Sequence, residues 1–298
     1  MDTPYRDYVR FGTSSWAYEE WKGNVYFKDY DESNFKKDCL TEYAADRRFS
    51  TVGMDLFFYQ PPTASLLTHY ANQLPQGFKT CSKVWQELTI YRYAHQANLG
   101  ARKDQVNDRF LDPKLFTETV LRPYRTAFLD HTGPFIFEFQ YIKKSDLPFD
   151  AFVEKLDAFF AELPGDFSYS VEIRNKDFLK PAYFNVLKKH NVAHVFNHWS
   201  YMPPLAEQMK RDAFTADFVV ARILTPIGMS YQETQKKFGS FDRIIERQPQ
   251  MRKDLMRLIE ISVRNRKLLY LLINNRIEGS APETITELLE MLEGRLLK

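Results

Sequence analysis

Short runs of β-branched and aromatic residues alternate with longer amphipathic runs along the whole chain, and this alternation limits the fold more than any other feature. The expected strands are Val9–Ser14, Thr51–Phe57, Gly77–Ser82, Pro134–Gln140, Ser168–Arg174, Ala193–Asn197, Phe218–Ile223 and Leu268–Asn274. The expected helices are Asn34–Arg48, Thr63–Gln73, Pro113–Asp130, Phe149–Leu163, Pro181–His190, Leu205–Lys210, Ser230–Asn265 and Ala281–Leu292. Eight alternating strand–helix units predict an α/β fold, a single (β/α)8 TIM-like barrel over residues 1–298.

A doubly wound nucleotide-binding sheet is the weaker interpretation. No glycine-rich turn follows the first expected strand, no Walker-type phosphate loop is present, and the chain has 11 glycines in total. A length of 298 residues suits one closed barrel.

Two segments are longer than a minimal barrel needs. The segment Val84–Asp112 follows the third expected strand and groups Tyr91, Arg92, Tyr93 and His95. We expect it to be an extended loop, either a wall of the active site or a decoration packed on the barrel rim. The second segment, Tyr231–Arg266, has charges of both signs, which favours a solvated helix face.

Charge and cysteine content narrow the class of protein. The net charge of +2 does not steer the molecule toward nucleic acid or an anionic membrane. Cys39 and Cys81 are the only cysteines and lie in no redox or metal motif, which favours the reducing cytoplasm. The polar start of the chain predicts no signal peptide, and no segment has the about 20 apolar residues needed to span a membrane.

Glu172 and Arg174 lie in an otherwise apolar expected strand. They are two residues apart, so both side chains point to the same face of that strand. An unpaired buried charge is very costly, so the spacing predicts an ion pair at a polar site. Polar residues also occupy the carboxyl ends of the other expected strands, where barrels build their active sites.

Together these strand ends predict a polar pocket at the barrel mouth. The catalytic candidates are Glu172, Lys83 and Asp55. The ligand-binding candidates are Trp16, Tyr59, Gln140, Arg174, Asn197, Arg222, Asn274 and Asn275. A buried network in which these groups satisfy one another is the alternative.

Glu172 is the expected acid/base, since burial in an apolar strand end raises the pKa of a carboxyl while a nearby cation lowers it. Lys83 is a candidate proton donor, Schiff-base lysine or anion-binding charge, and the electrostatic role is favoured. Arg174 and Arg222 are suited to a carboxylate or phosphate, or to structural pairing with Glu172 or Asp55. A glycosidase would require the carboxyls of Glu172 and Asp55 to face each other about 5–10 Å apart.

No metal site and no cofactor are expected. The six histidines fall mainly outside the strand ends, and His190, His194 and His198 straddle a helix-to-strand turn rather than one helix face. No G-x-S-x-G elbow marks a serine hydrolase. The expected partner is a small polar or anionic ligand.

Several strand ends together resemble one family, the DUF72 or YecE-like proteins. The matching segments are Gly12-Thr13-Ser14-Ser15-Trp16-x-Tyr18-x-x-Trp21-x-Gly23-x-x-Tyr26, Phe49-Ser50-Thr51-Val52 with Phe58-Tyr59, Phe78-Lys79 to Lys83, Phe139-Gln140, Val171-Glu172-Ile173-Arg174, Arg222, and Asn274-Asn275 with Glu278-Gly279 and Ala281-Pro282. The resemblance implies a TIM-barrel-like fold and carries no established activity.

The sequence departs from the family pattern at four positions. The glutamate of the second strand is Gly53 and its asparagine is Asp55, while the histidine ending the seventh strand is Leu224, followed by Thr225 in place of glycine. The Pro-Pro that follows Phe139-Gln140 in the family is missing as well.

Three functions remain open at this level. The first is an enzyme on a small anionic or sugar-like substrate, with Glu172 as acid/base and Lys83 and Arg174 holding the anion. The second is a binding or scaffold protein without turnover, which the departures at Gly53 and Leu224 favour. The third and least favoured is nucleic-acid processing by Arg92, Arg102, Lys103 and Arg109 of the long loop.

Overall fold

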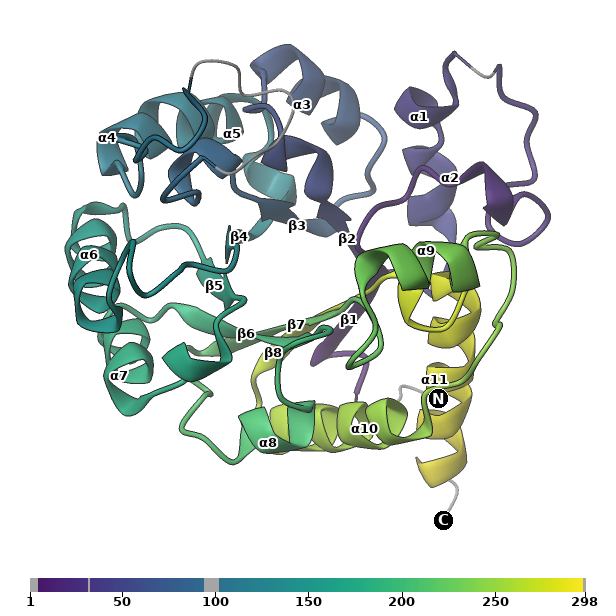
Figure 1. Cartoon of the computed structure of the whole chain (residues 1–298). Coiled ribbons are helices and arrows are strands. Elements are labelled where there is room, and N and C mark those ends of the chain that lie inside the picture. Colours follow the sequence, from purple (N-terminus) through teal and green to yellow (C-terminus); the bar gives the residue numbers. More distant parts are fainter. Residues whose placement is uncertain (1–4, 32, 94–101, 297–298) are drawn as a thin grey trace.

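The computed structural model describes residues 5–31, 33–93 and 102–296, and in it eight parallel strands form a nearly closed barrel surrounded by helices (Figure 1). The strands are β1 (Val9–Thr13), β2 (Thr51–Met54), β3 (Lys79–Lys83), β4 (Thr132–Phe139), β5 (Tyr169–Ile173), β6 (Ala193–His198), β7 (Phe218–Ile223) and β8 (Leu268–Ile273). From β2 to β8 each strand pairs with the next one in the chain, and β8 pairs with β1, which leaves β1 and β2 as the two ends of the sheet. The predicted TIM-like barrel is confirmed.

The seam between β1 and β2 closes the barrel through a close backbone approach. The amide of Ser50, just before β2, donates to the carbonyl oxygen of Phe11 on β1 over 2.8 Å. Glycines face this seam from both strands: a Cβ atom on Gly53 would lie 2.6 Å from the carbonyl oxygen of Ser14. The absence of a side chain at Gly53 therefore lets the two strands meet.

The helices lie outside the strands (Figure 1). Their bounds are α1 (Phe35–Asp38), α2 (Leu40–Ala45), α3 (Ala64–Ala71), α4 (Pro113–Leu115), α5 (Arg122–Ala127), α6 (Phe149–Glu162), α7 (Pro181–Lys189), α8 (Leu205–Met209), α9 (Tyr231–Phe238), α10 (Pro249–Arg264) and α11 (Ala281–Leu296). A π-helical turn, Phe116–Leu121, joins α4 to α5 within the segment predicted as one helix. Within the described ranges, no helix combines the length and apolar character that a membrane span requires.

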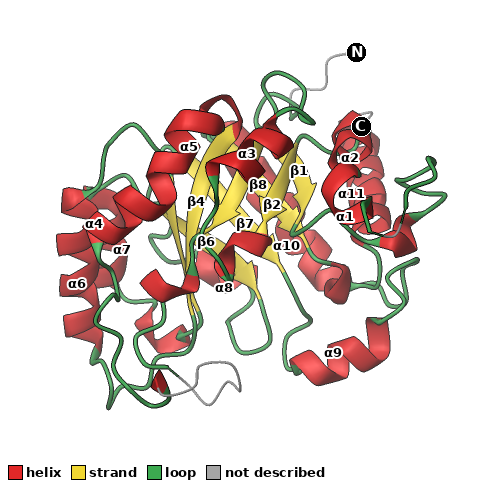
Figure 2. Cartoon of the chain, turned by 90° about the horizontal axis from the view of Figure 1, so that it is seen from above, coloured by secondary structure: helices red, strands yellow, loops and turns green. Residues whose placement is uncertain are grey.

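The prediction of one helix over Ser230–Asn265 is wrong, because the segment contains two helices of different roles. Helix α9 begins with a capping box formed by Ser230 and Glu233 and ends at Gly239, whereas α10 begins at Pro249. Glycine after one helix and proline at the first position of the next explain the break. Helix α10 packs on the barrel, while α9 lies beyond the carboxyl ends of the strands (Figure 2).

Side chains inside the barrel change from apolar to charged along the strands. One buried apolar cluster includes Cys81, Ile136, Val195, Val220 and Leu272. Side chains alternate along a strand, so the residue two positions further on points the same way. At all five of these strands, that residue is polar: Lys83, Glu138, Asn197, Arg222 and Asn274. An ionic layer therefore lies on an apolar floor at the carboxyl ends of the strands.

Candidate functional site

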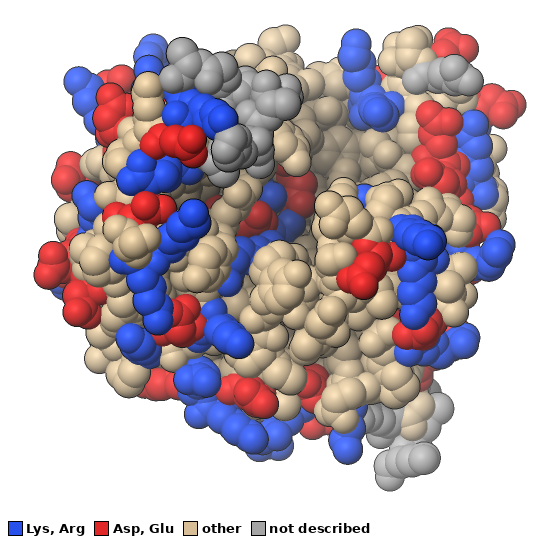
Figure 3. Space-filling view, viewed as in Figure 1, with Lys and Arg blue, Asp and Glu red and all other residues tan. Residues whose placement is uncertain are grey.

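A cavity of about 620 Å³ opens at the carboxyl ends of the strands, and we call it the central cavity. Its wall includes charged side chains from six parts of the barrel: Asp55, Lys83, Glu138, Arg174, Arg222 and Arg276. Figure 3 shows this face of the molecule, with a hollow near its middle in which charged groups of both signs gather. This is the end of the barrel at which the sequence predicts a polar pocket.

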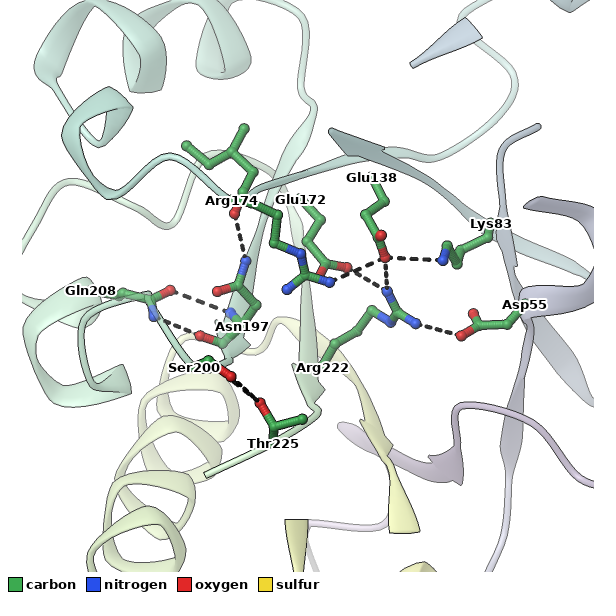
Figure 4. A network of polar contacts seen from close by, with 11 residues as sticks. Asp55, Lys83, Glu138, Glu172, Arg174, Asn197, Ser200, Gln208, Arg222 and Thr225 are labelled. Atoms are coloured by element: carbon green, nitrogen blue, oxygen red, sulfur yellow. Dashed lines mark hydrogen bonds and ion pairs between the residues drawn. The ribbon is translucent and has the colours of Figure 1, made fainter. Parts of the chain in front are cut away.

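Arg222 on β7 is the centre of the ionic layer (Figure 4). Its Nη1 atom donates to Glu138 Oε2 over 2.8 Å and to Glu172 Oε2 over 2.6 Å. Its Nη2 atom donates to Asp55 Oδ2 over 2.6 Å. One guanidinium, 2% exposed, thus bridges carboxylates from three segments of the barrel.

Two further cations complete the layer. Arg174 Nη2 lies 2.6 Å from Glu172 Oε1 and 3.2 Å from Glu138 Oε2, so the predicted Glu172–Arg174 pair is present. Lys83 Nζ lies 3.1 Å from Glu138 Oε2 and 3.8 Å from the centre of the Phe58 ring. Three cations and three carboxylates therefore form one network. Each charge in it lies beside an opposite charge, which offsets the cost of removing it from water.

The three carboxyls differ in environment. Burial opposes ionisation of Glu138, but the nearby charges of Lys83, Arg174 and Arg222 prevail and lower its pKa. Burial raises the pKa of Asp55, and this outweighs the opposing charges of Arg222 and Lys83. Glu172 is wholly buried, whereas the side chain of Asp55 is 27% exposed. Asp55 is therefore the carboxyl that combines access to the cavity with a raised pKa.

The pKa of Arg222 is also shifted from its ordinary value. Burial disfavours its charged form, yet the carboxylates of Asp55, Glu172 and Glu138 raise the pKa of the guanidinium above its ordinary value. It remains a cation at every pH at which the protein is folded.

The structure brings together seven of the eleven residues predicted for the site on the wall of the central cavity. These are Asp55, Tyr59, Lys83, Gln140, Arg174, Arg222 and Asn274. Glu172 lies behind the wall, where it bonds Arg174 and Arg222.

The remaining three predicted residues have structural positions. Trp16 is 2% exposed and packs edge-on against Tyr70 in the core. Asn197 is wholly buried and its amide donates to the carbonyl oxygen of Ile173 over 3.0 Å. Asn275 is buried, and its Oδ1 accepts from the amide of Ala281 at the start of α11 over 2.8 Å. Each was selected as a polar or aromatic strand-end residue, and each is used by its local backbone or core.

Glu138 is the main site residue that the sequence reasoning missed. It lies two residues before Gln140 in an apolar strand, which is the spacing that singled out Glu172 and Arg174. Other cavity residues gave a weaker signal: Tyr141, Trp199, Tyr231 and Arg276 come from loops or from the start of α9. Tyrosine and tryptophan are as common in cores as in pockets, so composition alone does not separate the two uses.

Two arginines of the long loop after β3 are paired with carboxylates. Arg102 Nη1 lies 2.7 Å from Glu87 Oε1, and Arg92 Nε lies 3.1 Å from Asp146 Oδ1. Glu87 is 5% exposed and also accepts from the hydroxyl of Tyr93. His95 of this loop lies outside the described residues.

The parts of the chain that the structure describes contain no candidate metal site, since no three His, Cys, Asp or Glu side chains there are arranged to hold an ion. Cys39 and Cys81 are both buried and unpaired with each other. The wall of the central cavity itself presents carboxyl, ammonium and guanidinium groups.

Comparison with known proteins agrees with this architecture. No curated protein matches the sequence. A crystal structure of a DUF72 family protein from Thermotoga maritima superposes with a TM-score of 0.66 at 19% identity, covering 96% of this chain and 99% of the other. Two crystal structures of a DUF72 family protein from Enterococcus faecalis give TM-scores of 0.59 and 0.64 at 16% and 17% identity, each covering 96% of this chain and 98% and 95% of theirs. The family model described as "Protein of unknown function DUF72" matches residues 10–297, and the chain belongs to the DUF72 family.

Proposed function

We propose that the barrel mouth is the active site of an enzyme that acts on a small anionic, polar substrate, with Asp55 as the acid/base. One observation carries this proposal: Asp55, with its raised pKa, shares the wall of one cavity with Lys83 and Arg174. Proton exchange and anion recognition are thereby combined within one hollow.

Charge favours an anionic ligand. The wall of the central cavity holds Lys83, Arg174, Arg222 and Arg276 against the carboxylates of Asp55 and Glu138. Arg222 bonds three carboxylates. Lys83 lies beside Glu138 alone, and the Nη1 atom of Arg174 has no hydrogen-bond partner among the described residues, so these two cations and Arg276 retain capacity to hold a substrate anion. The guanidinium of Arg174 lies 4.6 Å from the centre of the Trp199 ring, which fixes its plane.

Exposed aromatic rings support a substrate with a flat or sugar-like face. Tyr59, Tyr141 and Tyr231 line the cavity and are 68%, 64% and 62% exposed. Large aromatic side chains left in solvent around a hollow are typical of binding surfaces, because stacking on a ligand recovers their apolar contact.

We assign the acid/base role to Asp55 rather than to Glu172, the residue that the sequence favours. Glu172 has no exposed surface and is paired with two arginines, so it positions those arginines. Glu138, with its lowered pKa, stays ionised and acts as a fixed counter-charge. A raised carboxyl pKa brings proton transfer closer to neutral pH, as general acid–base catalysis requires.

The glycosidase variant has less support. Glu172 and Asp55 bond the two Nη atoms of one guanidinium, so Arg222 fills the space that a sugar would need between them. The nucleic-acid alternative loses two of its four expected contacts, because Arg92 and Arg102 are already paired with carboxylates.

The test is a turnover screen with a matched variant. Wild-type protein and Asp55→Asn are incubated with a panel of hydroxy acids, sugar acids and sugar phosphates, and consumption is followed by mass spectrometry. We expect at least one anionic compound to be consumed by the wild type and not by Asp55→Asn. Binding without consumption would favour the non-catalytic alternative, and turnover that persists in Asp55→Asn would remove Asp55 as the acid/base.

A further inference from the structure

A second cavity, of about 790 Å³, opens beside the central cavity, and we call it the side cavity. The two cavities share Tyr141, Arg174 and Trp199, so a ligand in one reaches the wall of the other. Beyond these three residues the side cavity is lined from three loops, and Tyr201 comes from the loop that follows β6. Lys143, Lys144 and Ser145 follow β4, and Lys176 and Asp177 follow β5.

The side cavity contains cations with no carboxylate to balance them. Lys144 Nζ lies 2.7 Å from Asp177 Oδ2, which accounts for the one carboxylate in the lining. Lys143 and Lys176 are exposed and form no ion pair with any residue that the structure describes. The neighbouring Asp146 is itself paired with Arg92. Two positive charges of this cavity are therefore available to a ligand.

Arg174 supplies a buried donor at the boundary between the two cavities. Its side chain is 8% exposed, and Nη2 is held by Glu172 and Glu138. Its Nη1 atom is buried and has no hydrogen-bond partner among the described residues. A buried guanidinium N–H without an acceptor is costly, and such groups in native proteins usually serve a ligand or a functional site.

We propose that the side cavity binds a phosphate group, with Lys143 and Lys176 as its outer charges and Nη1 of Arg174 as its inner donor. A phosphate monoester carries a charge of about −1.5 to −2 near neutral pH, which two unpaired lysines balance. Guanidinium and ammonium groups are the usual partners of phosphate oxygens. The inference rests on the proposed function, because it makes phosphorylated compounds the substrate class of the neighbouring central cavity.

The two adjoining cavities are placed to hold the two ends of one phosphorylated ligand. Arg174 and Trp199 belong to both walls, so a phosphate on the Arg174 side of the side cavity leaves the remainder of the molecule beside Lys83 and Asp55. Trp199 and Tyr201 pack edge-on with their ring centres 5.2 Å apart and form the aromatic part of the side cavity. The side cavity thereby accommodates the charged end of a substrate while its polar end faces the acid/base.

The test measures binding of inorganic phosphate by isothermal titration calorimetry at constant ionic strength. The variants are Lys143→Ala/Lys176→Ala, Lys83→Gln in the central cavity, and Lys155→Ala. Lys155 is an exposed lysine on α6 that lines neither cavity, so it is the control for loss of surface charge. We expect wild type and Lys155→Ala to bind phosphate alike, the double variant to bind at least about tenfold more weakly, and Lys83→Gln to weaken binding less than the double variant does.

Absence of phosphate binding at millimolar concentration, or equal binding by the double variant, would overturn the inference. Loss of binding in Lys83→Gln instead of the double variant would place the anion in the central cavity, which refutes the side cavity while leaving the proposed function intact. Sugar phosphates then separate the two sources of phosphate. A sugar phosphate that binds more tightly than inorganic phosphate, with the extra affinity lost in Lys83→Gln, identifies an ester as the ligand. If no ester binds more tightly than inorganic phosphate, the ligand is the free ion.

Discussion

Glu138 and Glu172 are register partners on the neighbouring parallel strands β4 and β5, so two carboxylates lie side by side inside the barrel. A single atom, Nη1 of Arg222, donates to both of them, over 2.8 Å and 2.6 Å. Arg222 comes from β7, which pairs with neither strand, so the contact crosses the barrel interior. The ionic layer thus ties together strands that share no backbone hydrogen bonds.

Replacing Arg222 with methionine is expected to lower the free energy of unfolding by about 3–5 kcal/mol at pH 7, because two adjacent buried carboxylates lose one of the two arginines that they share. The loss relative to wild type should shrink at pH 5, because removing one of the three cations that lower the pKa of Glu138 lets this carboxyl take up a proton more readily. Urea unfolding followed by tryptophan fluorescence at both pH values measures the two differences.

The control for this variant is Arg243→Met. Arg243 pairs with Asp242 at 3.1 Å, with side chains 68% and 43% exposed, and such surface pairs contribute about 0–1 kcal/mol. An Arg222→Met protein that loses no more stability than Arg243→Met would show that the ionic layer does not support the fold.

Asp55→Asn is expected to separate binding from chemistry. Removing a negative charge from the cavity wall should tighten binding of an anionic substrate by on the order of 1 kcal/mol. Loss of the proton-transferring group should lower kcat by about 100-fold or more. The two opposite changes are read from initial rates over a range of substrate concentrations, with Asp166→Asn as a control: that carboxylate pairs with Arg125, outside the mouth, and is 52% exposed.

Most of the fold could be predicted from the sequence because the barrel repeats one pattern eight times. The buried parallel strand Leu268–Ile273 is a continuous apolar run, and Phe218–Ile223 is apolar except at Arg222. Turn-forming segments such as Leu74-Pro75-Gln76-Gly77 separate strands from helices. Predicted element boundaries are wrong where a local turn ends a strand early. The second strand, expected to reach Phe57, ends at Met54 because a 3-10 turn begins at Asp55.

The site could be predicted only in part, because strand ends alone do not show what each side chain bonds. Position at a strand end identified Lys83 and Arg222, whereas parity along the strand identified Glu172 with Arg174 and would have identified Glu138 as well. Parity does not reveal that Asn275 caps a helix or that Trp16 belongs to the core. Nor does it reveal the side cavity, whose lysines come from irregular loops with no periodic signal.

Acid should destabilise the protein through two buried histidines on β6. Burial lowers the pKa of both His194 and His198 from 6.5 to about 4. The unfolded chain therefore binds more protons than the folded one between these values, and stability present above pH 6.5 is lost as the pH falls toward 4. The expected loss is roughly 3 kcal/mol for each histidine across that window.

The measurement is the free energy of unfolding at several pH values from 4 to 7. His198→Gln should flatten the pH dependence by roughly half, since one titrating group is removed. Ile259→Val, a buried change on α10 that carries no titrating group, should lower stability by about 0.5–1.5 kcal/mol at every pH. If the free energy of unfolding of His198→Gln depends on pH as steeply as that of the wild type, the His198 side chain is not buried in its neutral form.

Gly53 should tolerate no side chain, although glutamate is the residue that the family pattern places there. A Cβ atom at Gly53 would lie 2.6 Å from the carbonyl oxygen and 3.0 Å from the Cα of Ser14, and these are backbone atoms of the chain leaving β1. The strands would have to part at the seam that closes the barrel. We expect Gly53→Ala to lower the free energy of unfolding by about 1–3 kcal/mol, and Gly53→Glu by more.

Gly165→Ala is the matched comparison, because it also removes one glycine but meets no atom within 4 Å in the loop between α6 and β5. Its backbone has no positive φ, so restricting the unfolded chain should leave stability unchanged or raise it by up to about 1 kcal/mol. Thermal unfolding compares the two variants, and hydrogen exchange at the amides of Ser50 and Thr13 reports on the seam itself. Equal melting temperatures with unchanged exchange would mean that β1 yields to a methyl group without cost, and the closure of this barrel would then depend on something other than the glycine at its seam.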